Sequence, residues 1–121
     1  MSVVSTVLVM VVALEHLYIM YLETFATSSS RTSKTFNIDE EKLMDPTVNV
    51  LLKNQGIYNG FLALALIYAA LFSNHALEIS TLLVIVIIGV AIYGGLTSSK
   101  SIILKQGGPA ILALLSIVIF N

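Results

Sequence analysis

Long uninterrupted runs of apolar residues constrain this sequence more than any other feature. Four of them are long enough to cross a bilayer, and they cover residues 3–25, 50–72, 77–98 and 101–120. A helix needs about 20 mostly apolar residues to cross the hydrocarbon layer. The runs are continuous and do not alternate apolar with polar residues, which argues against the strands of a membrane barrel. We therefore expect an all-α polytopic membrane protein, a compact four-transmembrane-helix bundle with up-down-up-down topology.

The composition excludes several other classes of protein. Of the 121 residues, 57% are hydrophobic and only 11% are charged, whereas a soluble domain carries about 25% charged residues. The net charge of −1 excludes the basic surface of a nucleic-acid-binding protein. Because the chain has no cysteine, disulfide frameworks and thiolate metal sites are excluded as well. The four runs leave almost no room for a soluble part, so residues 1–121 are expected to form a single membrane domain.

Local signals predict how some of these elements begin. Asp45 followed by Pro46 is typical of an N-cap and the first residue of a helix, here the helix that carries the second run. Asn37 with Glu40 three residues later resembles a capping box and predicts a short surface helix over residues 38–44. The first run has no positively charged segment before it and contains titratable residues. We therefore expect it to be a permanent span and not a cleaved signal peptide.

The basic residues lie in or beside only two of the connections between the runs. They are Arg31, Lys34, Lys42 and Lys53 at the first connection and Lys100 and Lys105 at the third. Because Lys and Arg collect in cytoplasmic loops, we expect a cytoplasmic loop at 26–49 and N- and C-termini outside, in a multi-pass protein of the plasma membrane. Residues 26–36 of that loop are rich in Ser and Thr and are expected to form a polar linker.

Two adjacent titratable residues lie near the middle of the first run. Counted from its cytoplasmic end at the rise of a helix, Glu15 is about 15 Å deep, and His16 follows it. An ionisable residue at that depth costs about 2.5–3.5 kcal/mol on insertion scales, so it normally faces the bundle interior or water. We expect Glu15 and His16 to form a catalytic acid–base pair. Glu23 lies at the cytoplasmic interface, where we expect a solvated side chain or one paired with Lys or Arg.

Polar residues of the second run form a stripe on one helix face. Gln55, Tyr58 and Asn59 are spaced i, i+3 and i+4, whereas the outer halves of all four runs are almost wholly apolar. We expect a cavity in the cytoplasmic half, lined by Glu15, His16, Asn54, Gln55, Tyr58 and Asn59. The expected ligand-binding residues are Glu23, Asn54, Gln55, Tyr58, Asn59, Tyr93 and Gln106. A stripe of this kind also occurs where polar side chains merely hold helices together, at about 0.6 kcal/mol each.

Three functions are compatible with this pattern. The first is binding of, or action on, a small lipophilic or amphipathic molecule in the polar cavity. The second is a small proton-coupled transporter working as an oligomer, because a four-span chain with Glu15 midway along its first span resembles small multidrug-resistance exporters. The one-sided distribution of Lys and Arg and the absence of tryptophan argue against that resemblance. The third function is an accessory subunit of a larger membrane complex.

Partners and cofactors are less constrained by the sequence. The lipid bilayer is the one expected partner that all three functions share, and the interhelical Gly89, Gly94 and Gly95 are compatible with a homo-oligomer. A metal site built from Glu15, His16 and Glu23 is not expected, because one histidine in the bundle is few for a transition metal. No motif identifies a cofactor.

Several strings also resemble one family. They are ALEHLYIMYLETF at 13–25, NQGIYNGFLALALIY at 54–68 and IYGGLTSSKSIILKQGGPAILAL at 92–114, together with Phe36. These strings are similar to a group of small bacterial and fungal membrane proteins, the domain of unknown function 1304. The resemblance covers nearly the whole chain and implies a four-helix membrane fold. It implies that the Glu-His, Asn-Gln-Gly-x-Tyr-Asn and Gln-Gly-x-Pro-Ala motifs define the group, and it implies no activity.

Overall fold

The computed structural model describes residues 1–121 apart from the side chain of Ile102. The described residues form helices without strands, which confirms the all-α bundle. The elements are α1 (Val3–Met20), which continues into a π turn η1 (Tyr21–Phe25), the short helices α2 (Ser30–Phe36) and α3 (Glu40–Leu43), and the long helices α4 (Pro46–Leu71), α5 (Ala76–Thr97) and α6 (Ser101–Phe120). In the described part of the chain, α1 with η1, α4, α5 and α6 are long and apolar enough to cross a membrane.

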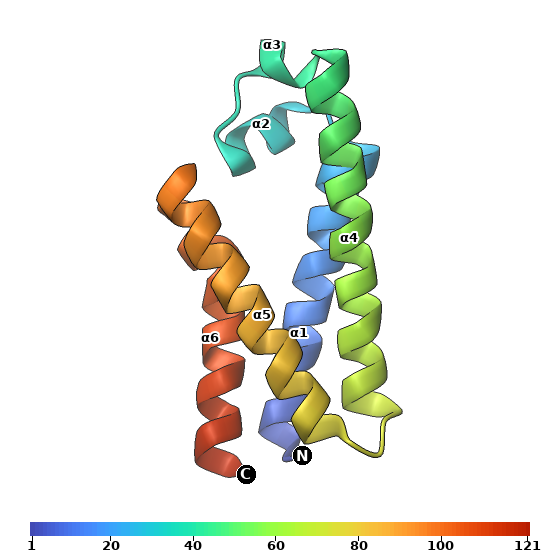
Figure 1. The fold of residues 1–121 in the computed structure, drawn as a ribbon, viewed down its shortest axis with the longest axis vertical. Coiled ribbons are helices and arrows are strands. Elements are labelled where there is room, and N and C mark those ends of the chain that lie inside the picture. The colour runs from blue at the N-terminus through green and yellow to red at the C-terminus, as the bar shows by residue number, and fades with distance from the viewer.

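The long helices run alternately up and down, so the bundle has two distinct ends (Figure 1). We call the end that carries α2 and α3 the loop end, and the end that carries Met1 and Asn121 the terminal end. Helix α1 packs against α4 on one side and α6 on the other, and α5 packs mainly against α6. Toward the loop end, α5 and α6 lean away from α4 (Figure 1).

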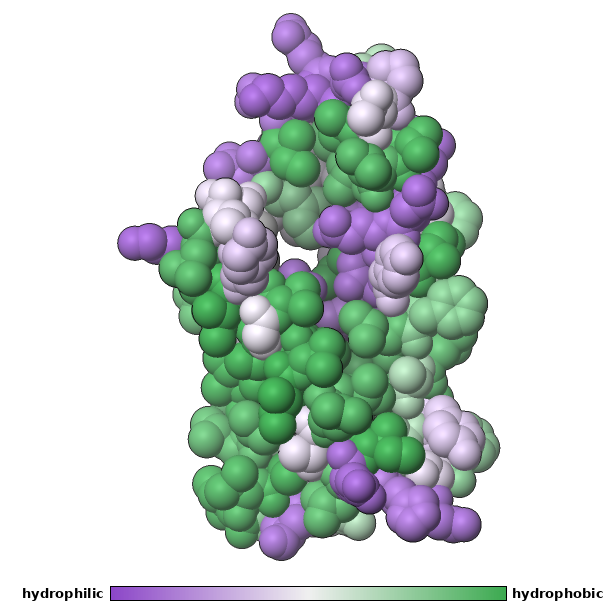
Figure 2. Space-filling model, viewed as in Figure 1, coloured by the Kyte–Doolittle hydropathy of each residue, from purple (hydrophilic) through white to green (hydrophobic). Residues whose placement is uncertain are grey.

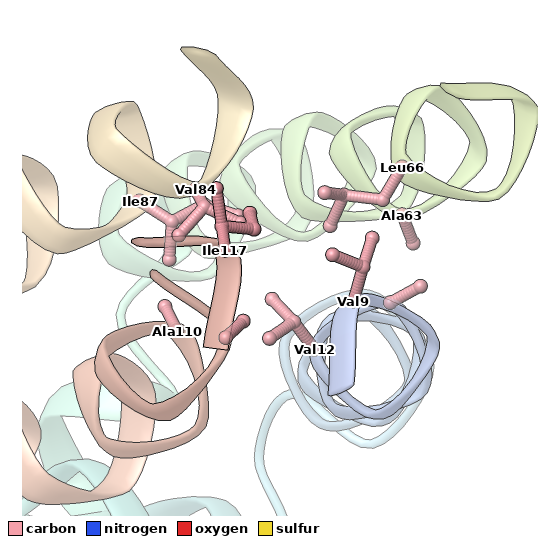
Figure 3. Close-up of a cluster of buried hydrophobic side chains, with 10 residues drawn as sticks. Val9, Val12, Ala63, Leu66, Val84, Ile87, Ala110 and Ile117 are labelled. Atoms are coloured by element: carbon pink, nitrogen blue, oxygen red, sulfur yellow. The ribbon is translucent and has the colours of Figure 1, made fainter. Parts of the chain in front are cut away.

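The apolar core contains side chains from all four long helices (Figure 3). Buried members of this core are Val9, Val12, Ala63, Leu66, Val84, Ile87, Ala110 and Ile117. The outer faces of the same helices expose many large apolar side chains, such as Leu64, Ile85 and Leu112. In water an apolar surface of this extent would aggregate, whereas lipid tails solvate it. The four apolar helices therefore have the surface of a membrane protein.

The start of α4 confirms the expected cap at Asp45 and Pro46. The Asp45 side chain accepts hydrogen bonds from the backbone N–H groups of Thr47 and Val48, at 2.9 Å and 3.2 Å. Pro46 is the first helical residue, where its missing N–H group leaves no hydrogen bond unmade. The long helix therefore begins where its sequence signal lies.

The first connection differs from its expected structure. Residues 26–36 were expected to form a polar linker, but they contain helix α2, whose N-cap Ser29 accepts from the N–H of Thr32. The expected capping box at Asn37 is wrong, because α3 begins after Asp39. Asn37 instead ends α2 in the left-handed conformation, with φ of 55°. Asparagine tolerates that conformation better than most residues, so here it stops a helix.

Two glycines let α4 lie unusually close to the end of α1. A Cβ atom added to Gly56 would overlap Thr24 Oγ1 and lie 3.0 Å from the Thr24 backbone nitrogen. A Cβ atom added to Gly60 would overlap Met20 Sδ. Small residues four apart on one face are the usual way for two membrane helices to pack closely. Gly89 of α5 is different, because nothing described lies within 4 Å of its added Cβ.

We predict opposite effects of alanine at Gly56 and at Gly89. Alanine favours a helix over glycine by about 1 kcal/mol, so Gly89→Ala should keep or raise the melting temperature in lipid nanodiscs. Gly56→Ala should lower it, because overpacking costs about 1–3 kcal/mol and the clash includes rigid backbone. Equal melting temperatures for the two variants would contradict the close packing of α4 on η1.

Candidate functional site

The last turn of α1 is a π turn that directs Glu23 into the bundle. Its defining hydrogen bond runs from the N–H of Ala26 to the carbonyl of Tyr21, at 2.9 Å. A π turn is rare and occurs frequently at functional sites. Within this turn the Glu23 side chain is 0% exposed, while Phe25 two residues later is 71% exposed.

The Glu23 carboxylate accepts one hydrogen bond at each oxygen from α4. Gln55 Nε2 donates to Oε2 and Asn59 Nδ2 donates to Oε1, both at 2.7 Å. Within the described residues, no Lys, Arg or His nitrogen lies within 4.0 Å of this carboxylate. The expectation that Glu23 is solvated or paired with a basic residue is therefore wrong. The π turn rotates the side chain inward, and Gly56 brings the two amides within reach.

Threonine hydroxyls satisfy the backbone carbonyls around this turn. Thr27 donates to the carbonyl of Glu23 at 2.7 Å, and Thr32 of α2 donates to those of Leu22 and Ala26, at 2.9 Å and 2.8 Å. Thr24 donates to the carbonyl of Lys53 at 3.0 Å, which ties η1 to α4. A carbonyl without a partner is costly near lipid. Hydroxyls of the Ser- and Thr-rich stretch therefore supply hydrogen-bond donors to the carbonyls at the end of α1.

A cavity of about 830 Å³ lies between α4 and α5 at the loop end. All seven residues expected to bind ligand line it, namely Glu23, Asn54, Gln55, Tyr58, Asn59, Tyr93 and Gln106. Other parts of its wall are apolar and include Leu51, Leu62 and Val90. Figure 2 shows an opening in the upper half of the molecule with hydrophilic side chains along one border. We call this space the α4–α5 cavity.

The structure does not bring Glu15 and His16 into that cavity. Glu15 lines a smaller hollow of about 320 Å³ beside α2 and α6, together with Tyr18 and Lys105. His16 is fully buried, and its Nδ1 lies 2.9 Å from the carbonyl of Val12. Because a carbonyl only accepts, this nitrogen carries the hydrogen. The expected single cavity is thus divided into two hollows.

The arrangement of Glu15 and His16 limits how they can exchange a proton. Glu15 Oε1 lies 3.8 Å from His16 Nδ1, which is too far for a hydrogen bond. The Nδ1 hydrogen is already donated to Val12. Among the described residues, neither Glu15 Oε1 nor His16 Nε2 has a hydrogen-bond partner, although both atoms are buried. The structure describes no group of three or more His, Cys, Asp or Glu that could hold a metal ion.

Two functional features were missed from the sequence. Gly56 and Gly60 position the amides, and their four-residue spacing is a known signal for close helix packing. The terminal end also contains polar contacts in a part expected to be apolar. There Ser116 donates to Ser5 at 3.0 Å, and Asn121 donates to Ser5 at 2.9 Å while accepting from the N–H of Ser2 at 2.8 Å. We call these contacts the terminal clasp.

We predict that the stability contributions of Glu23 and Asn59 are coupled. Asn59→Leu should destabilise the bundle by about 2 kcal/mol, because it leaves a buried carboxylate oxygen without a donor. Glu23→Met added to Asn59→Leu should recover most of that loss, since an apolar pair replaces the whole interaction. Melting temperatures in nanodiscs measure both effects.

Asn54→Leu is the matched control, since Asn54 is exposed and makes no side-chain hydrogen bond in the described part of the chain. It should leave the melting temperature nearly unchanged. A double variant no more stable than Asn59→Leu would contradict the coupling.

Comparison with known proteins identifies the family but no activity. Residues 10–118 match the family described as "Protein of unknown function (DUF1304)". The chain is also similar to "Uncharacterized protein YpaA" of Lactococcus lactis subsp. lactis (strain IL1403), with 60% identity over 116 residues, which cover 96% of this chain and 98% of that protein. No solved structure matches the chain. This chain, with its four apolar helices, therefore belongs to the DUF1304 family, whose function is unknown.

Proposed function

We propose that this protein binds a small lipophilic or amphipathic molecule in the α4–α5 cavity. The observation that carries the proposal is Glu23, a fully buried acidic side chain at the wall of a large and otherwise mostly apolar space. Helix-to-helix hydrogen bonds in membranes contribute only about 0.6 kcal/mol each, whereas a charged group in a span costs about 2.5–3.5 kcal/mol. Holding two helices together does not require such a group, so a binding role accounts for it better.

The shape and lining of the cavity support this role. Ligand sites typically measure about 300–1,000 Å³ and combine apolar walls with a few convergent polar groups. Here the polar groups gather on Glu23, Gln55 and Asn59, while Leu51 and Leu62 supply apolar surface. Because the cavity lies between α4 and α5 and the surface is open there (Figure 2), a molecule dissolved in the bilayer could enter sideways between these helices.

The second candidate is proton-coupled transport by an oligomer of the chain. One observation favours it: Phe36 and Gln106 border both the α4–α5 cavity and the hollow that contains Glu15. Two acidic side chains thus occupy adjoining hollows, where one could carry a proton while the other binds a substrate. Flux of a probe into proteoliposomes that depends on a pH gradient and is lost in Glu15→Gln would place this function first.

Orientation in the plasma membrane is part of the proposal. We propose that the loop end, with Arg31, Lys34 and Lys42, faces the cytoplasm. The chain has no cysteine, so single-cysteine variants report position directly. In intact cells an impermeant maleimide should label Asn74→Cys of the α4–α5 turn, and it should label Ser30→Cys of α2 only after lysis. The reverse pattern would overturn the orientation.

Ligand binding is tested by melting temperature in phosphatidylcholine nanodiscs. We expect dodecylammonium, dodecanol or dodecanoate to raise the melting temperature saturably, because a molecule that binds the folded state alone stabilises it. Val90→Phe fills the cavity wall and should abolish the effect. Val86→Phe makes the same change one turn earlier on α5, at a residue that does not line the cavity, and should retain it. No saturable shift with any of the three probes, or equal shifts in both variants, would refute the proposal.

A further inference from the structure

The orientation of the two amides determines which atoms the cavity presents to a ligand. Gln55 and Asn59 both direct their NH₂ groups at Glu23, so their carbonyl oxygens point elsewhere. In the part of the chain that the structure describes, neither oxygen takes part in a hydrogen bond, and both residues line the α4–α5 cavity. The polar part of the wall therefore offers acceptors, backed by a carboxylate that only accepts when ionised.

The charges around the cavity are unbalanced. Among the described residues that line it, Glu23 is the one charged residue. Neither Lys105 nor Arg31 is paired with Glu23 in the described structure, since Lys105 Nζ donates to the carbonyl of Thr35 at 3.2 Å and Arg31 donates to the Tyr18 hydroxyl at 3.1 Å. An opposite charge close to a carboxyl group favours its ionised form. The described lining of the cavity supplies no positive charge beside Glu23.

The neighbouring hollow provides an internal contrast. It contains one acidic residue, Glu15, and one basic residue, Lys105. Its lining charges therefore balance without a ligand, whereas those of the α4–α5 cavity do not. A preference for cations should belong to the larger cavity alone.

Aromatic side chains add a second attraction for a cation. Tyr58 of α4 and Tyr93 of α5 line the cavity and are 75% and 70% exposed. Both helices that border the space therefore offer an aromatic ring with free surface. A cation over the face of such a ring is attracted by the ring electrons, more strongly the further it is desolvated.

Resting on the proposed function, we infer that the ligand is a monocationic amphiphile whose head group donates N–H hydrogen bonds, an alkylammonium ion. The positive charge pairs with the Glu23 carboxylate, and the N–H groups donate to the carbonyl oxygens of Gln55 and Asn59. The alkyl chain lies along Leu51 and Leu62 of the cavity wall. A quaternary ammonium ion has the charge without the donors, and an alcohol has a donor without the charge. An anionic head group has no N–H to donate to the amide oxygens, and it is repelled by the like charge of Glu23.

The experiment ranks head groups on a constant chain in the wild-type protein. Dodecylammonium, dodecyltrimethylammonium, dodecanol and dodecanoate are titrated into phosphatidylcholine nanodiscs, and each apparent affinity is taken from the saturable rise in melting temperature. Empty nanodiscs are titrated alongside to correct for partition into lipid. Dodecylammonium should bind about tenfold more tightly than dodecanol, which corresponds to about 1.4 kcal/mol, and more tightly than the other two.

Two variants that each remove one carboxylate test whether the preference for dodecylammonium depends on Glu23. Glu23→Gln should bring dodecylammonium down to the affinity of dodecanol, whereas Glu78→Gln, an exposed position at the opposite end of the bundle, should keep the wild-type ranking. Saturable binding with dodecanol or dodecanoate equal to or above dodecylammonium would overturn the inference and leave the proposed function standing. No saturable binding of any probe would overturn both. If Glu23→Gln does not fold, the wild-type ranking still decides.

Discussion

The close approach of α4 to the end of α1 is the constraint on which the rest of this structure depends. Gly56 and Gly60 remove the side chains that would separate the two helices. Gln55 and Asn59 occupy the positions just before these glycines and therefore reach Glu23 at 2.7 Å. Close packing and hydrogen bonding therefore depend on each other, because a bulkier residue between the helices would move the donors away from the buried Glu23 carboxyl group.

The first connection contains two short helices because the backbone carbonyls at the end of α1 need hydrogen-bond partners. A π turn shifts the hydrogen-bond pattern at the end of α1, and this must be compensated inside or beside a layer that offers no water. The hydroxyl of Thr32, fully buried in α2, shares its one hydrogen between the carbonyls of Leu22 and Ala26. The helix α2 consequently sits over the loop end, where Phe36 borders both hollows. The contacts by which α2 satisfies the end of α1 therefore also place Phe36 at the border of the two hollows.

Sequence reasoning predicted the fold and the polar residues that α4 contributes to the cavity, but it wrongly placed Glu15 and His16 in the same space. Apolar runs have the length that the bilayer requires, and the i, i+3, i+4 spacing placed Gln55 and Asn59 on one face whatever the tertiary contacts. The location of Glu23 depended on a single π turn, which no local propensity signals. Depth in the membrane and the adjacent His16 favour Glu15 over Glu23 in the sequence. The side to which each points depends on which neighbour packs there, and depth says nothing about that.

The two ends of the bundle are held together differently, because the terminal clasp lies at one end only. Ser5, Ser116 and Asn121 fasten α1 to α6 at the terminal end, while the opposite ends of α4 and α5 diverge (Figure 1). A tilt of α5 about its terminal end would therefore change the α4–α5 cavity most at the loop end. A helix of 22 residues is about 33 Å long, so a tilt of about 10° would move its far end by about 6 Å. Tyr93, near the loop end, would move much further than Ile79, near the terminal end.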